Sequence, residues 1–243
     1  MALSAADALD LLLRDRLDAR GFLANASNHT LLCTVGGTGS GLAAIYKPRA
    51  GERPLWDFPA GTLCQREVAA YEVSAYLGWD LVPPTVLRDG PMGDGSVQLF
   101  VPHDPSEHYF VLVEDPANHA SLQRMAVFDL LVNNADRKGG HILRAEDDGR
   151  LQGIDHGLAF HAQPKLRTVI WELGGTPVDA AVRADAARLT DALAAGEAIA
   201  TRLAALLDAT EVTALKRRAS QVAELAALPD PPEEARPYPW PPL

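Results

Sequence analysis

Cysteine, positive charge and long apolar runs are all scarce in this sequence, and each shortage excludes a class of protein. With only Cys33 and Cys64, the chain has little basis for a disulfide framework or a zinc site built on cysteine. Its 22 lysines and arginines are outnumbered by 32 aspartates and glutamates, and the net charge of −10 argues against nucleic acid as a partner. No run approaches the roughly 20 apolar residues that cross a bilayer. Charged residues also interrupt the stretch 5–17, where a secretory signal would lie, so we expect a cytoplasmic protein.

The rest of the composition is that of an ordinary globular chain. Of its 243 residues, 47 % are hydrophobic and 22 % are charged, which argues against wholesale disorder. A chain of this length forms one large domain or two small lobes and can bury a substantial core. The negative net charge also disfavours stable association with an anionic membrane. The densest basic run, Lys216 to Arg218, lies on the polar face of a predicted helix.

Short apolar runs separated by turn residues dominate the first hundred residues. A short helix is predicted at the start, with Ser4 as its N-cap and Asp7 in its first turn. Five strand-length runs and one helical segment follow. The strands are predicted at Phe22–Ala24, Leu31–Val35, Leu42–Tyr46, Thr85–Leu87 and Val97–Val101, and the helix at Gln65–Leu77. This half of the chain is therefore expected to form a small antiparallel sheet with one helix beside it.

Helical patterns dominate the second half of the chain. Ser121–Asn134 is apolar on nearly every side, which predicts a buried helix. Ile142–Leu143 and Leu151–Ile154 predict a small hairpin. From Val178 onward the apolar spacing predicts two or three amphipathic helices.

The proline-rich segment 229–243 cannot be helical. We expect an extended tail that either docks through Tyr238 and Trp240 or is disordered, and that offers a site for a protein partner. Together the two halves predict an α+β protein of two lobes with a cleft between them. The N-lobe, residues 1–101, would hold the sheet, and the C-lobe, residues 102–243, would be mainly helical.

Two turns between the predicted strands are candidates for holding phosphate. The glycine-rich run Gly36–Gly41 lacks the pattern of a phosphate-binding loop and joins two strands, so a hairpin turn is the better interpretation. The turn formed by Ser27, Asn28, His29 and Thr30 has small polar side chains and backbone N–H groups that could fold over a triphosphate. Its alternative is an Asx-type turn without a ligand.

Lys47 ends an apolar strand and precedes Pro48. A lysine at a strand end is usually a solvated charge, unless a carboxylate is brought to meet it. Glu67, in the predicted helix, is a candidate partner, and such a pair can hold the α- and β-phosphates of a nucleotide. Glu72 in the same helix competes for this role.

Two aspartates in the second half give the strongest chemical signal. Asp136 ends the buried helix and begins a tight glycine-containing loop, and Asp155 follows a short apolar strand. Two carboxylates so placed suit phosphoryl transfer, because one can orient the nucleophile and accept its proton while the other binds a divalent metal at the phosphates. Either aspartate alone would be interpreted as a turn residue. The presence of both, after a lysine and glutamate pair, favours the chemical interpretation.

Four motifs give the chain a family resemblance. They are Glu67–Tyr71 (EVAAY), Leu77–Thr85 (LGWDLVPPT), Phe128–Arg137 (FDLLVNNADR) and Ile154–Phe160 (IDHGLAF). Through them, residues from about 20 to 165 resemble the phosphatidylinositol 3-/4-kinase superfamily, most closely the type II 4-kinase pattern and an actinobacterial phosphatidylinositol-kinase-like family. The resemblance implies a two-lobed kinase-like fold that uses ATP with Mg²⁺ or Mn²⁺.

The resemblance also implies a role for each matching residue. The phosphate loop of the nucleotide site would be Ser27, Asn28, His29 and Thr30. The phosphate-binding lysine would be Lys47, with Glu67 as its helix partner. The hinge that contacts adenine through its backbone would be Leu99, Phe100 and Val101. Asp136 would be the catalytic-loop aspartate, with Lys138 beside it. Asp155 would bind the metal, with His156 next to it in the matching triplet. Asp129, inside the buried helix, would have a structural role and accept hydrogen bonds from loop backbone N–H groups.

His141 departs from the family pattern. The superfamily's catalytic loop ends at this point in an asparagine that binds metal. Mg²⁺ prefers oxygen ligands, whereas imidazole suits softer divalent ions. Three outcomes are open: His141 binds Mn²⁺ or another transition metal, it leaves the metal to Asp155 and water, or the protein is a weakened or inactive kinase.

The expected function is ATP- and metal-dependent transfer of the γ-phosphate to a hydroxyl group. One kinase-like fold serves lipids, proteins and small molecules, so the acceptor does not follow from the fold. Because the chain is acidic, a protein or a small polar molecule is favoured over phosphatidylinositol. Three alternatives stay open: a pseudokinase that binds a nucleotide or a partner, a transferase that moves AMP onto a protein, and an interaction module that uses the tail.

Overall fold

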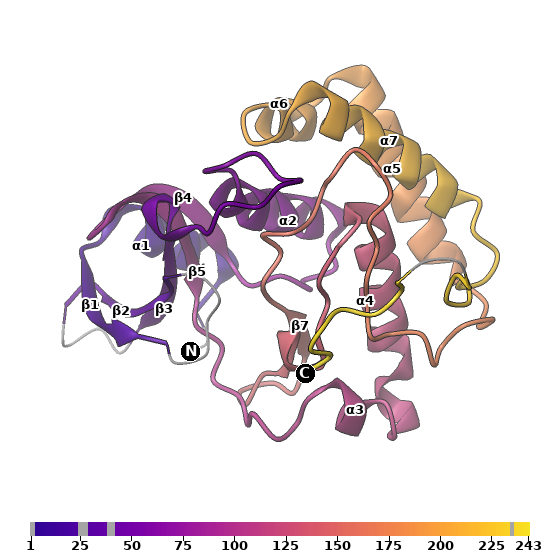
Figure 1. The fold of residues 1–243 in the computed structure, drawn as a ribbon, viewed down its shortest axis with the longest axis horizontal. Coiled ribbons are helices and arrows are strands. Elements are labelled where there is room, and N and C mark those ends of the chain that lie inside the picture. Colours follow the sequence, from indigo (N-terminus) through magenta and orange to yellow (C-terminus); the bar gives the residue numbers. More distant parts are fainter. Residues whose placement is uncertain (1–2, 24–28, 38–41, 234–235) are drawn as a thin grey trace.

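The computed structural model describes residues 3–23, 29–37, 42–233 and 236–243. A β-sheet with helices α1 and α2 beside it forms one lobe, and a set of helices forms the other (Figure 1). This is the α+β architecture that the sequence predicts. Within the described ranges, no helix is both long and apolar enough to cross a membrane.

The N-lobe is built on a five-stranded antiparallel sheet with the strand order β1-β2-β3-β5-β4. Its strands are β1 (Leu17–Phe22), β2 (Leu31–Val35), β3 (Ala43–Pro48), β4 (Thr85–Gly90) and β5 (Gly93–Leu99). Burial alternates along β2 and β3, as expected when successive side chains point to opposite faces of a sheet. One face therefore buries a small core that includes Cys33, Ala44 and Tyr46.

The first strand differs from its prediction. The sequence predicts a strand at Phe22–Ala24, but β1 runs from Leu17 to Phe22, with Leu17 opposite Val35 and Phe22 opposite Leu31. Ala24 lies outside the described residues. Because β1 is at the edge of the sheet and most of its side chains are exposed, its sequence lacks the apolar pattern that identifies a buried strand.

The β4–β5 hairpin is longer than predicted and its second strand ends earlier. Gly90 pairs with Gly93, so both strands continue through residues that the sequence assigns to a turn. Glycine permits this at Gly95, where a Cβ atom would lie 2.4 Å from the Lys47 carbonyl oxygen and 2.7 Å from the Tyr46 ring. Residues 100 and 101 follow the strand and lead into the C-lobe.

Two helices accompany the sheet. Helix α1 (Ala5–Arg14) is capped as predicted, because the Asp7 amide donates to the Ser4 hydroxyl at 3.1 Å. Helix α2 (Leu63–Leu77) is buried on most sides and ends at Gly78, whose φ is 71°. It contacts β4 and β5 as well as helices of the C-lobe, so it connects the two lobes.

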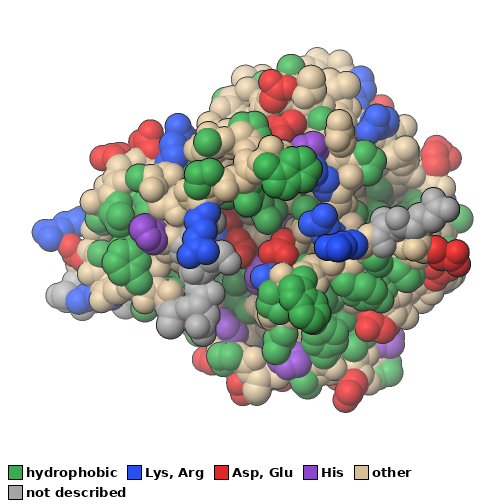
Figure 2. All heavy atoms as spheres, viewed as in Figure 1, with side chains coloured by type: hydrophobic (Ala, Val, Ile, Leu, Met, Phe, Trp, Pro, Cys, Tyr) green, Lys and Arg blue, Asp and Glu red, His purple; other side chains and the backbone are tan. Residues whose placement is uncertain are grey.

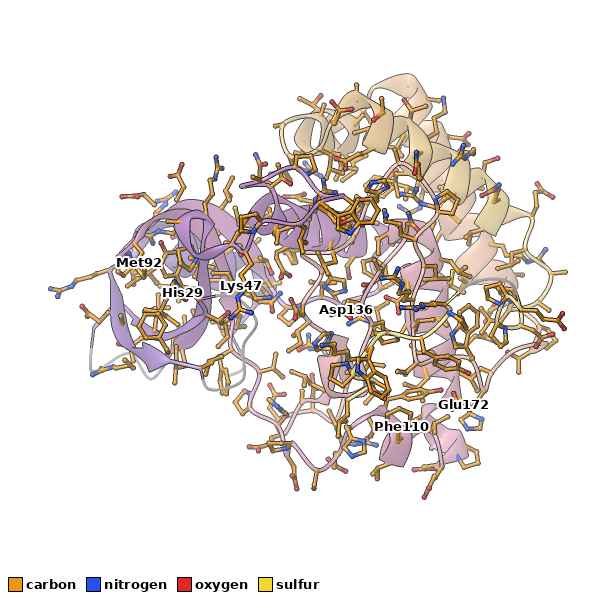
Figure 3. The ribbon with its side chains drawn as sticks, in the orientation of Figure 1. His29, Lys47, Met92, Phe110, Asp136 and Glu172 are labelled. Carbon is orange, nitrogen blue, oxygen red and sulfur yellow. The ribbon has the colours of Figure 1, made fainter. Side chains whose placement is uncertain are left out.

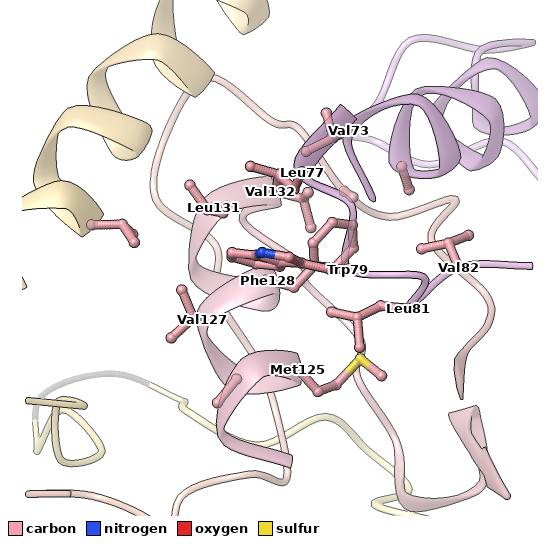
Figure 4. Close-up of a cluster of buried hydrophobic side chains, with 14 of the residues drawn as sticks. Val73, Leu77, Trp79, Leu81, Val82, Met125, Val127, Phe128, Leu131 and Val132 are labelled. Carbon is pink, nitrogen blue, oxygen red and sulfur yellow. The ribbon is translucent and has the colours of Figure 1, made fainter. Parts of the chain in front are cut away.

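The C-lobe is organised around α4 (His119–Val132), which is buried as its sequence predicts. Figure 4 shows Met125, Val127, Phe128, Leu131 and Val132 of this helix packed with side chains from α2 and the segment after it. The other elements of this lobe are α3 (Tyr109–Leu112), the hairpin β6 (Ile142–Arg144) and β7 (Leu151–Gly153), α5 (Ala180–Ala195), α6 (Ala198–Ala204) and α7 (Ala209–Ala223), with short 3-10 turns at Pro116–Asn118 and Gly139–His141. A third 3-10 turn, Arg49–Gly51, follows β3 in the N-lobe. Helix α7 packs against both α4 and α5.

The tail docks on the C-lobe through its backbone. In its last described stretch, residues 236–243, the Pro237 carbonyl accepts a hydrogen bond from the Thr168 amide at 2.9 Å. Five residues later, the Pro242 carbonyl accepts one from the Gly139 amide at 2.7 Å. The tail is thus held at two points.

The rings named in the prediction do not make these anchors. Tyr238 is 50 % exposed and Trp240 is 89 % exposed, so the expectation of docking through these side chains is wrong. The indole of Trp171, on the C-lobe itself, supplies a further anchor by donating to the Pro237 carbonyl at 3.1 Å. Prolines lack amide hydrogens but keep their carbonyl oxygens, which explains why the tail binds as an acceptor.

Candidate active site

A cavity of about 700 Å³ opens between the two lobes. Its walls come from β3, α2 and the segment after β5 on one side, and from the loop after α4 (residues 133–141) and the loop after β7 (residues 154–161) on the other. Among the site residues predicted from the sequence, those that line this one cavity are Thr30, Lys47, Glu67, Leu99, Phe100, Val101, Asp136, Lys138, His141 and Asp155.

The predicted phosphate loop is only partly described. Ser27 and Asn28 lie outside the described residues. His29 does not line the cavity; its ring lies edge-on against Phe22 at 5.7 Å, and its amide donates to the Gly51 carbonyl at 3.2 Å. Of the two residues of this loop that are described, Thr30 reaches the cavity wall and His29 does not.

Lys47 joins three elements at the centre of the site. It extends from β3 toward the C-lobe (Figure 3), where its Nζ contacts Glu67 Oε1 on α2 and lies 2.8 Å from Asp155 Oδ1. Glu72, the competing candidate, instead pairs with Arg202 at 2.6 Å. The two glutamates are five residues apart, which separates them by about 140° around the helix, so only one can face the cavity.

Charge holds Lys47 and Asp155 in their ionised forms, although burial raises the pKa of Glu67. Burial alone would lower the pKa of Lys47, but the carboxylates of Asp155 and Glu67 outweigh it and hold that pKa above its ordinary value. Burial opposes ionisation of Asp155, yet the Lys47 ammonium holds the pKa of Asp155 well below its usual range. The second Glu67 oxygen accepts the His156 amide at 2.9 Å, which ties α2 to the loop after β7.

Asp136 faces the cavity from the opposite lobe (Figure 3). Helix α4 ends at Asn133, which adopts a left-handed conformation with φ of 53° and turns the chain toward the cavity. The Asp136 amide donates to the Asn134 side chain at 3.0 Å, and Lys138 Nζ lies 3.6 Å from Asp136 Oδ2. Burial raises the pKa of Asp136 to about 6, although the Lys138 cation opposes this shift.

The His141 ring contacts both the loop of Asp136 and Asp155 itself. Its Nδ1 lies 3.0 Å from the Asp136 carbonyl oxygen and 3.4 Å from the Lys138 amide, and its Nε2 lies 3.3 Å from Asp155 Oδ2. Burial lowers the pKa of His141 to about 4, so the ring is neutral at pH 7. The neutral ring has two tautomers: with the proton on Nδ1 it donates to the Asp136 carbonyl and turns the lone pair of Nε2 toward Asp155, and with the proton on Nε2 it donates to Asp155.

Asp155 and His141 form a donor pair that suits a divalent cation. One Asp155 oxygen is occupied by Lys47, while the other faces Nε2 of His141; in the tautomer with its proton on Nδ1, these two acceptors would be stabilised by a cation between them. In the part of the chain that the structure describes, no three His, Cys, Asp or Glu side chains form a metal cage. The pair is thus a partial ligand set of the kind that phosphates and water complete.

In the predicted hinge, Leu99 to Val101, two of the three backbone N–H groups already donate within the protein. The amide of Leu99 donates to the Pro84 carbonyl at 2.8 Å, and that of Phe100 donates to the Ala43 carbonyl at 3.0 Å. Adenine therefore cannot use these two N–H groups, and its contact with other backbone atoms of this segment stays a prediction. None of the described hydrogen bonds uses the Val101 amide, so Val101 is the donor left in this segment.

Sequence reasoning missed Arg137, which is fully buried between the two loops of the C-lobe. Its guanidinium pairs with Asp129 at 3.0 Å and donates to the carbonyls of His141 at 3.2 Å and Ile154 at 2.8 Å. It also lies 2.6 Å from Nε2 of His156, whose pKa burial holds well below its ordinary value. One side chain thus connects the loop of Asp136 with the loop of Asp155.

Asp129 has the expected structural role but different partners. Its carboxylate accepts hydrogen bonds from Arg137, from Asn134 Nδ2 at 3.0 Å and from Thr168 Oγ1 at 3.2 Å, rather than from loop backbone N–H groups. A sequence signal for this pair existed. A carboxylate inside an apolar helix requires a buried cation nearby, and Arg137 is the first basic residue after α4.

Comparison with known sequences gives two matches. Residues 86–186 match the family described as Phosphatidylinositol 3- and 4-kinase. Protein Rv2133c of Mycobacterium tuberculosis is 43 % identical over 258 residues, an alignment that covers 93 % of this chain and 91 % of that protein.

Solved structures share the fold. The Golgi casein kinase with Mn/ADP bound has a TM-score of 0.56 at 13 % identity, over 90 % of this chain and 74 % of that one. The Helicobacter pylori proinflammatory kinase CtkA has a TM-score of 0.53 at 11 % identity, over 88 % of this chain and 94 % of that one. These similarities establish a two-lobed kinase-like fold. The two sequence matches place the chain in the phosphatidylinositol 3- and 4-kinase family, alongside the mycobacterial protein Rv2133c.

Proposed function

We propose that this protein is a kinase that transfers the γ-phosphate of ATP to a hydroxyl group of an acceptor, with the help of a divalent metal. The observation that carries the proposal is the Lys47 ammonium, held between Glu67 and Asp155 in the cavity that Asp136 also lines. A cation fixed in this way suits nucleotide phosphates, and a nearby carboxylate suits an acceptor hydroxyl. Membership of the family and the kinase-like fold support a phosphotransferase.

The nucleotide would lie along the N-lobe side of the cavity. Lys47 would bind the α- and β-phosphates, with Glu67 holding its ammonium in place. The Val101 amide would donate to adenine, and the apolar side chains of Leu143 and Ile154 would contact the ring. Thr30 would approach the phosphates, and Ser27 and Asn28 stay candidates for the same loop.

Asp136 would act on the acceptor. Its carboxylate would accept the proton of the acceptor hydroxyl as that oxygen forms a bond to the γ-phosphorus. The bond between the γ-phosphorus and the bridging oxygen would break, and ADP would leave with the electron pair. The raised pKa of Asp136, about 6, matches a base that works near neutral pH. Lys138 would offset the negative charge that gathers there.

Asp155 and His141 would hold the metal ion. When bound, a divalent ion neutralises phosphate charge, and Asp155 Oδ2 and His141 Nε2 are the atoms that would hold it. Because one donor is an imidazole nitrogen, we expect Mn²⁺ to be preferred over Mg²⁺. Nδ1 of His141 would keep its hydrogen bond to the Asp136 carbonyl, so the metal ligand and the base share one loop.

A second candidate is a pseudokinase that binds nucleotide without turnover. The observation behind it is again His141, because this residue stands where the superfamily has an asparagine that binds metal. The two candidates predict the same nucleotide site and differ only in whether phosphate is transferred.

Thermal unfolding with ATP tests the site. Wild type, Asp155→Ala and Asp148→Ala are titrated with ATP in Mn²⁺, in Mg²⁺ and in EDTA; Asp148 is an exposed aspartate that pairs with Arg150 outside the cavity. ATP at about 100 times its Kd stabilises the fold by about 2.7 kcal/mol, which raises Tm by about 5–10 °C. We expect a metal-dependent rise in wild type and in Asp148→Ala only. A rise retained by Asp155→Ala, or absent throughout, would overturn the assignment.

Product analysis in the same samples separates the remaining alternatives. ADP release with phosphate on the acceptor indicates a kinase, whereas pyrophosphate release with AMP on the acceptor indicates a nucleotidyl transferase. Binding without either product identifies a pseudokinase.

A further inference from the structure

Large hydrophobic side chains are exposed beside the loop that carries Asp136. Phe110 on α3 and Tyr238, Trp240 and Leu243 in the tail are between 37 % and 89 % exposed, and we name these four residues the tail patch. Figure 2 shows hydrophobic side chains gathered on this face where Figure 1 draws α3 and the end of the tail, next to the hollow between the lobes. An exposed apolar surface of this kind indicates a binding site rather than ordinary solvent-facing surface.

The tail patch is continuous with the loop after α4. The Gly139 amide donates to the Pro242 carbonyl at 2.7 Å. A Cβ atom on Gly139 would lie 2.9 Å from the Phe110 ring and 3.3 Å from Leu243 Cδ1, so the loop, α3 and the tail approach one another closely at this glycine. The patch and the candidate base therefore belong to one surface.

Trp240 extends this surface into the cavity. In sequence, Trp240 lies between the two backbone anchors of the tail, Pro237 and Pro242, and it is 89 % exposed. It lines the same cavity as Asp136, and the Gly139–Pro242 bond puts it on the side of the loop after α4 rather than of the hinge. A large aromatic ring is thus held at the entrance where an acceptor reaches the base.

Trp56 provides an internal comparison. It is 92 % exposed, and Lys165 lies over its ring at 5.1 Å. Unlike Trp240, it is not among the residues that line the cavity. The chain therefore carries two equally exposed tryptophans, of which one is in the cavity wall and one is outside it.

Positive charge borders the patch on the side of Asp136. Arg167 and Arg236 are both exposed. They are the residues just before Thr168 and Pro237, whose backbones are joined by a hydrogen bond, so the two arginines lie at the same edge of the tail patch. Lys138 adds a third cation 3.6 Å from the Asp136 carboxylate. In a chain with a net charge of −10, such a border favours an acceptor with acidic groups.

We propose that the tail patch docks the phosphate acceptor, and that this acceptor is an extended protein segment; the inference rests on the kinase function proposed above. The segment carries an apolar or aromatic residue near its reactive Ser or Thr, which packs on Trp240, and acidic rather than basic residues beside it. A small polar metabolite has no apolar surface to pack on these four side chains. Trp240 is the specificity-determining residue of this surface.

A peptide library tests the proposal. Short peptides with a central Ser or Thr, in which each flanking position is fixed in turn to each amino acid, are phosphorylated with radiolabelled ATP and Mn²⁺ by wild type, Trp240→Ala, Trp240→Phe and Trp56→Ala. We expect wild type to select large apolar residues at one or two positions and acidic over basic residues elsewhere. Trp240→Ala should lose the apolar selection, with kcat/KM for the best peptide about tenfold lower, mainly through KM. Trp240→Phe should retain most of the selection, and Trp56→Ala all of it.

The outcomes separate this inference from the function on which it rests. If wild type shows the ATP-dependent rise in Tm but phosphorylates no peptide, selects no apolar residue, or behaves like Trp240→Ala, the docking proposal is wrong and the nucleotide site stands. Equal losses in Trp240→Ala and Trp56→Ala would also overturn it. Phosphorylation of phosphatidylinositol vesicles in place of every peptide would assign the patch to a lipid acceptor. Absence of the ATP-dependent rise in wild type would instead refute the kinase function, and with it this inference.

Discussion

The two lobes position their site residues in different ways. In the N-lobe, Lys47 lies on β3 and Glu67 on α2, so regular hydrogen-bond ladders fix both side chains. In the C-lobe, Asp136, His141 and Asp155 all lie in loops or short turns. A loop has no ladder to hold it, and the C-lobe compensates with buried polar contacts.

Arg137 is the centre of those contacts. It is the one side chain described that joins Asp129 of α4 to backbone carbonyls at both ends of the site, at His141 and at Ile154. The comparison teaches that the same precision is reached in two ways: through secondary structure in one lobe and through buried polar contacts centred on Arg137 in the other. The predictions below test this contrast.

Replacing Arg137 should have the largest effect. Arg137→Met leaves Asp129 buried without its cation, and breaking a buried pair from one side costs about 3–5 kcal/mol. Urea unfolding should show this loss, whereas Arg150→Met, which removes an arginine with a 58 % exposed side chain, should change stability by less than about 1 kcal/mol. The double variant Asp129→Leu with Arg137→Met should recover part of the loss. Wild-type stability in Arg137→Met would mean that the loops are held by other contacts.

Glu67→Gln tests the N-lobe side of the comparison. The fold should survive because strand and helix are intact, but Lys47 loses a charged partner, and hydrogen bonds to charged groups contribute about 1.5–3 kcal/mol. The Kd for ATP should therefore rise by about ten- to a hundredfold, as measured by calorimetry. Glu72→Gln, on the same helix but paired with Arg202, is the matched control and should bind ATP normally. Equal effects of the two substitutions would remove Glu67 from the site.

The sequence predicts the regular half of the site better than the irregular half. Local patterns are enough to place Lys47 at a strand end and Glu67 on a helix, although only the helix geometry decides against Glu72. Asp136 and Asp155 are recognisable because the loops that hold them begin where apolar elements end. By contrast, the edge strand β1 carries little apolar signal because it is buried along so little of its length.

Contacts between distant segments could not be predicted in the same way. The role of Arg137 depends on carbonyl groups whose positions follow from tertiary packing. The hydrogen bonds that the Leu99 and Phe100 amides donate likewise depend on the register of neighbouring strands, which no local pattern encodes. The docking of the tail through proline carbonyls has no side-chain signature at all.

His141→Asn should change metal preference more than catalysis. If the imidazole nitrogen is a ligand, replacing it by an amide oxygen weakens Mn²⁺ relative to Mg²⁺. We expect the ratio of kcat/KM in Mn²⁺ to that in Mg²⁺ to fall about tenfold, within the range that metal-site substitutions produce. His161→Asn is the control, because its ring contacts Phe58 and not Asp155. An unchanged ratio would leave the metal to Asp155 and water.

The smallest expected effect concerns the pH profile of the C-lobe base. Asp136 accepts a proton only when ionised, and its pKa is raised to about 6, so kcat/KM should rise with pH through about 6 and level off above it. The Lys138 cation lowers this pKa, so Lys138→Met should move the midpoint upward. A partly exposed pair contributes up to about 1 kcal/mol, equivalent to a pKa shift of up to about 0.7 units. Rates in Lys138→Met should therefore fall by a few-fold below pH 6 and stay close to wild type at pH 8. A midpoint that does not move would mean that burial alone sets the pKa of Asp136, so that the loop tunes its base without the lysine beside it.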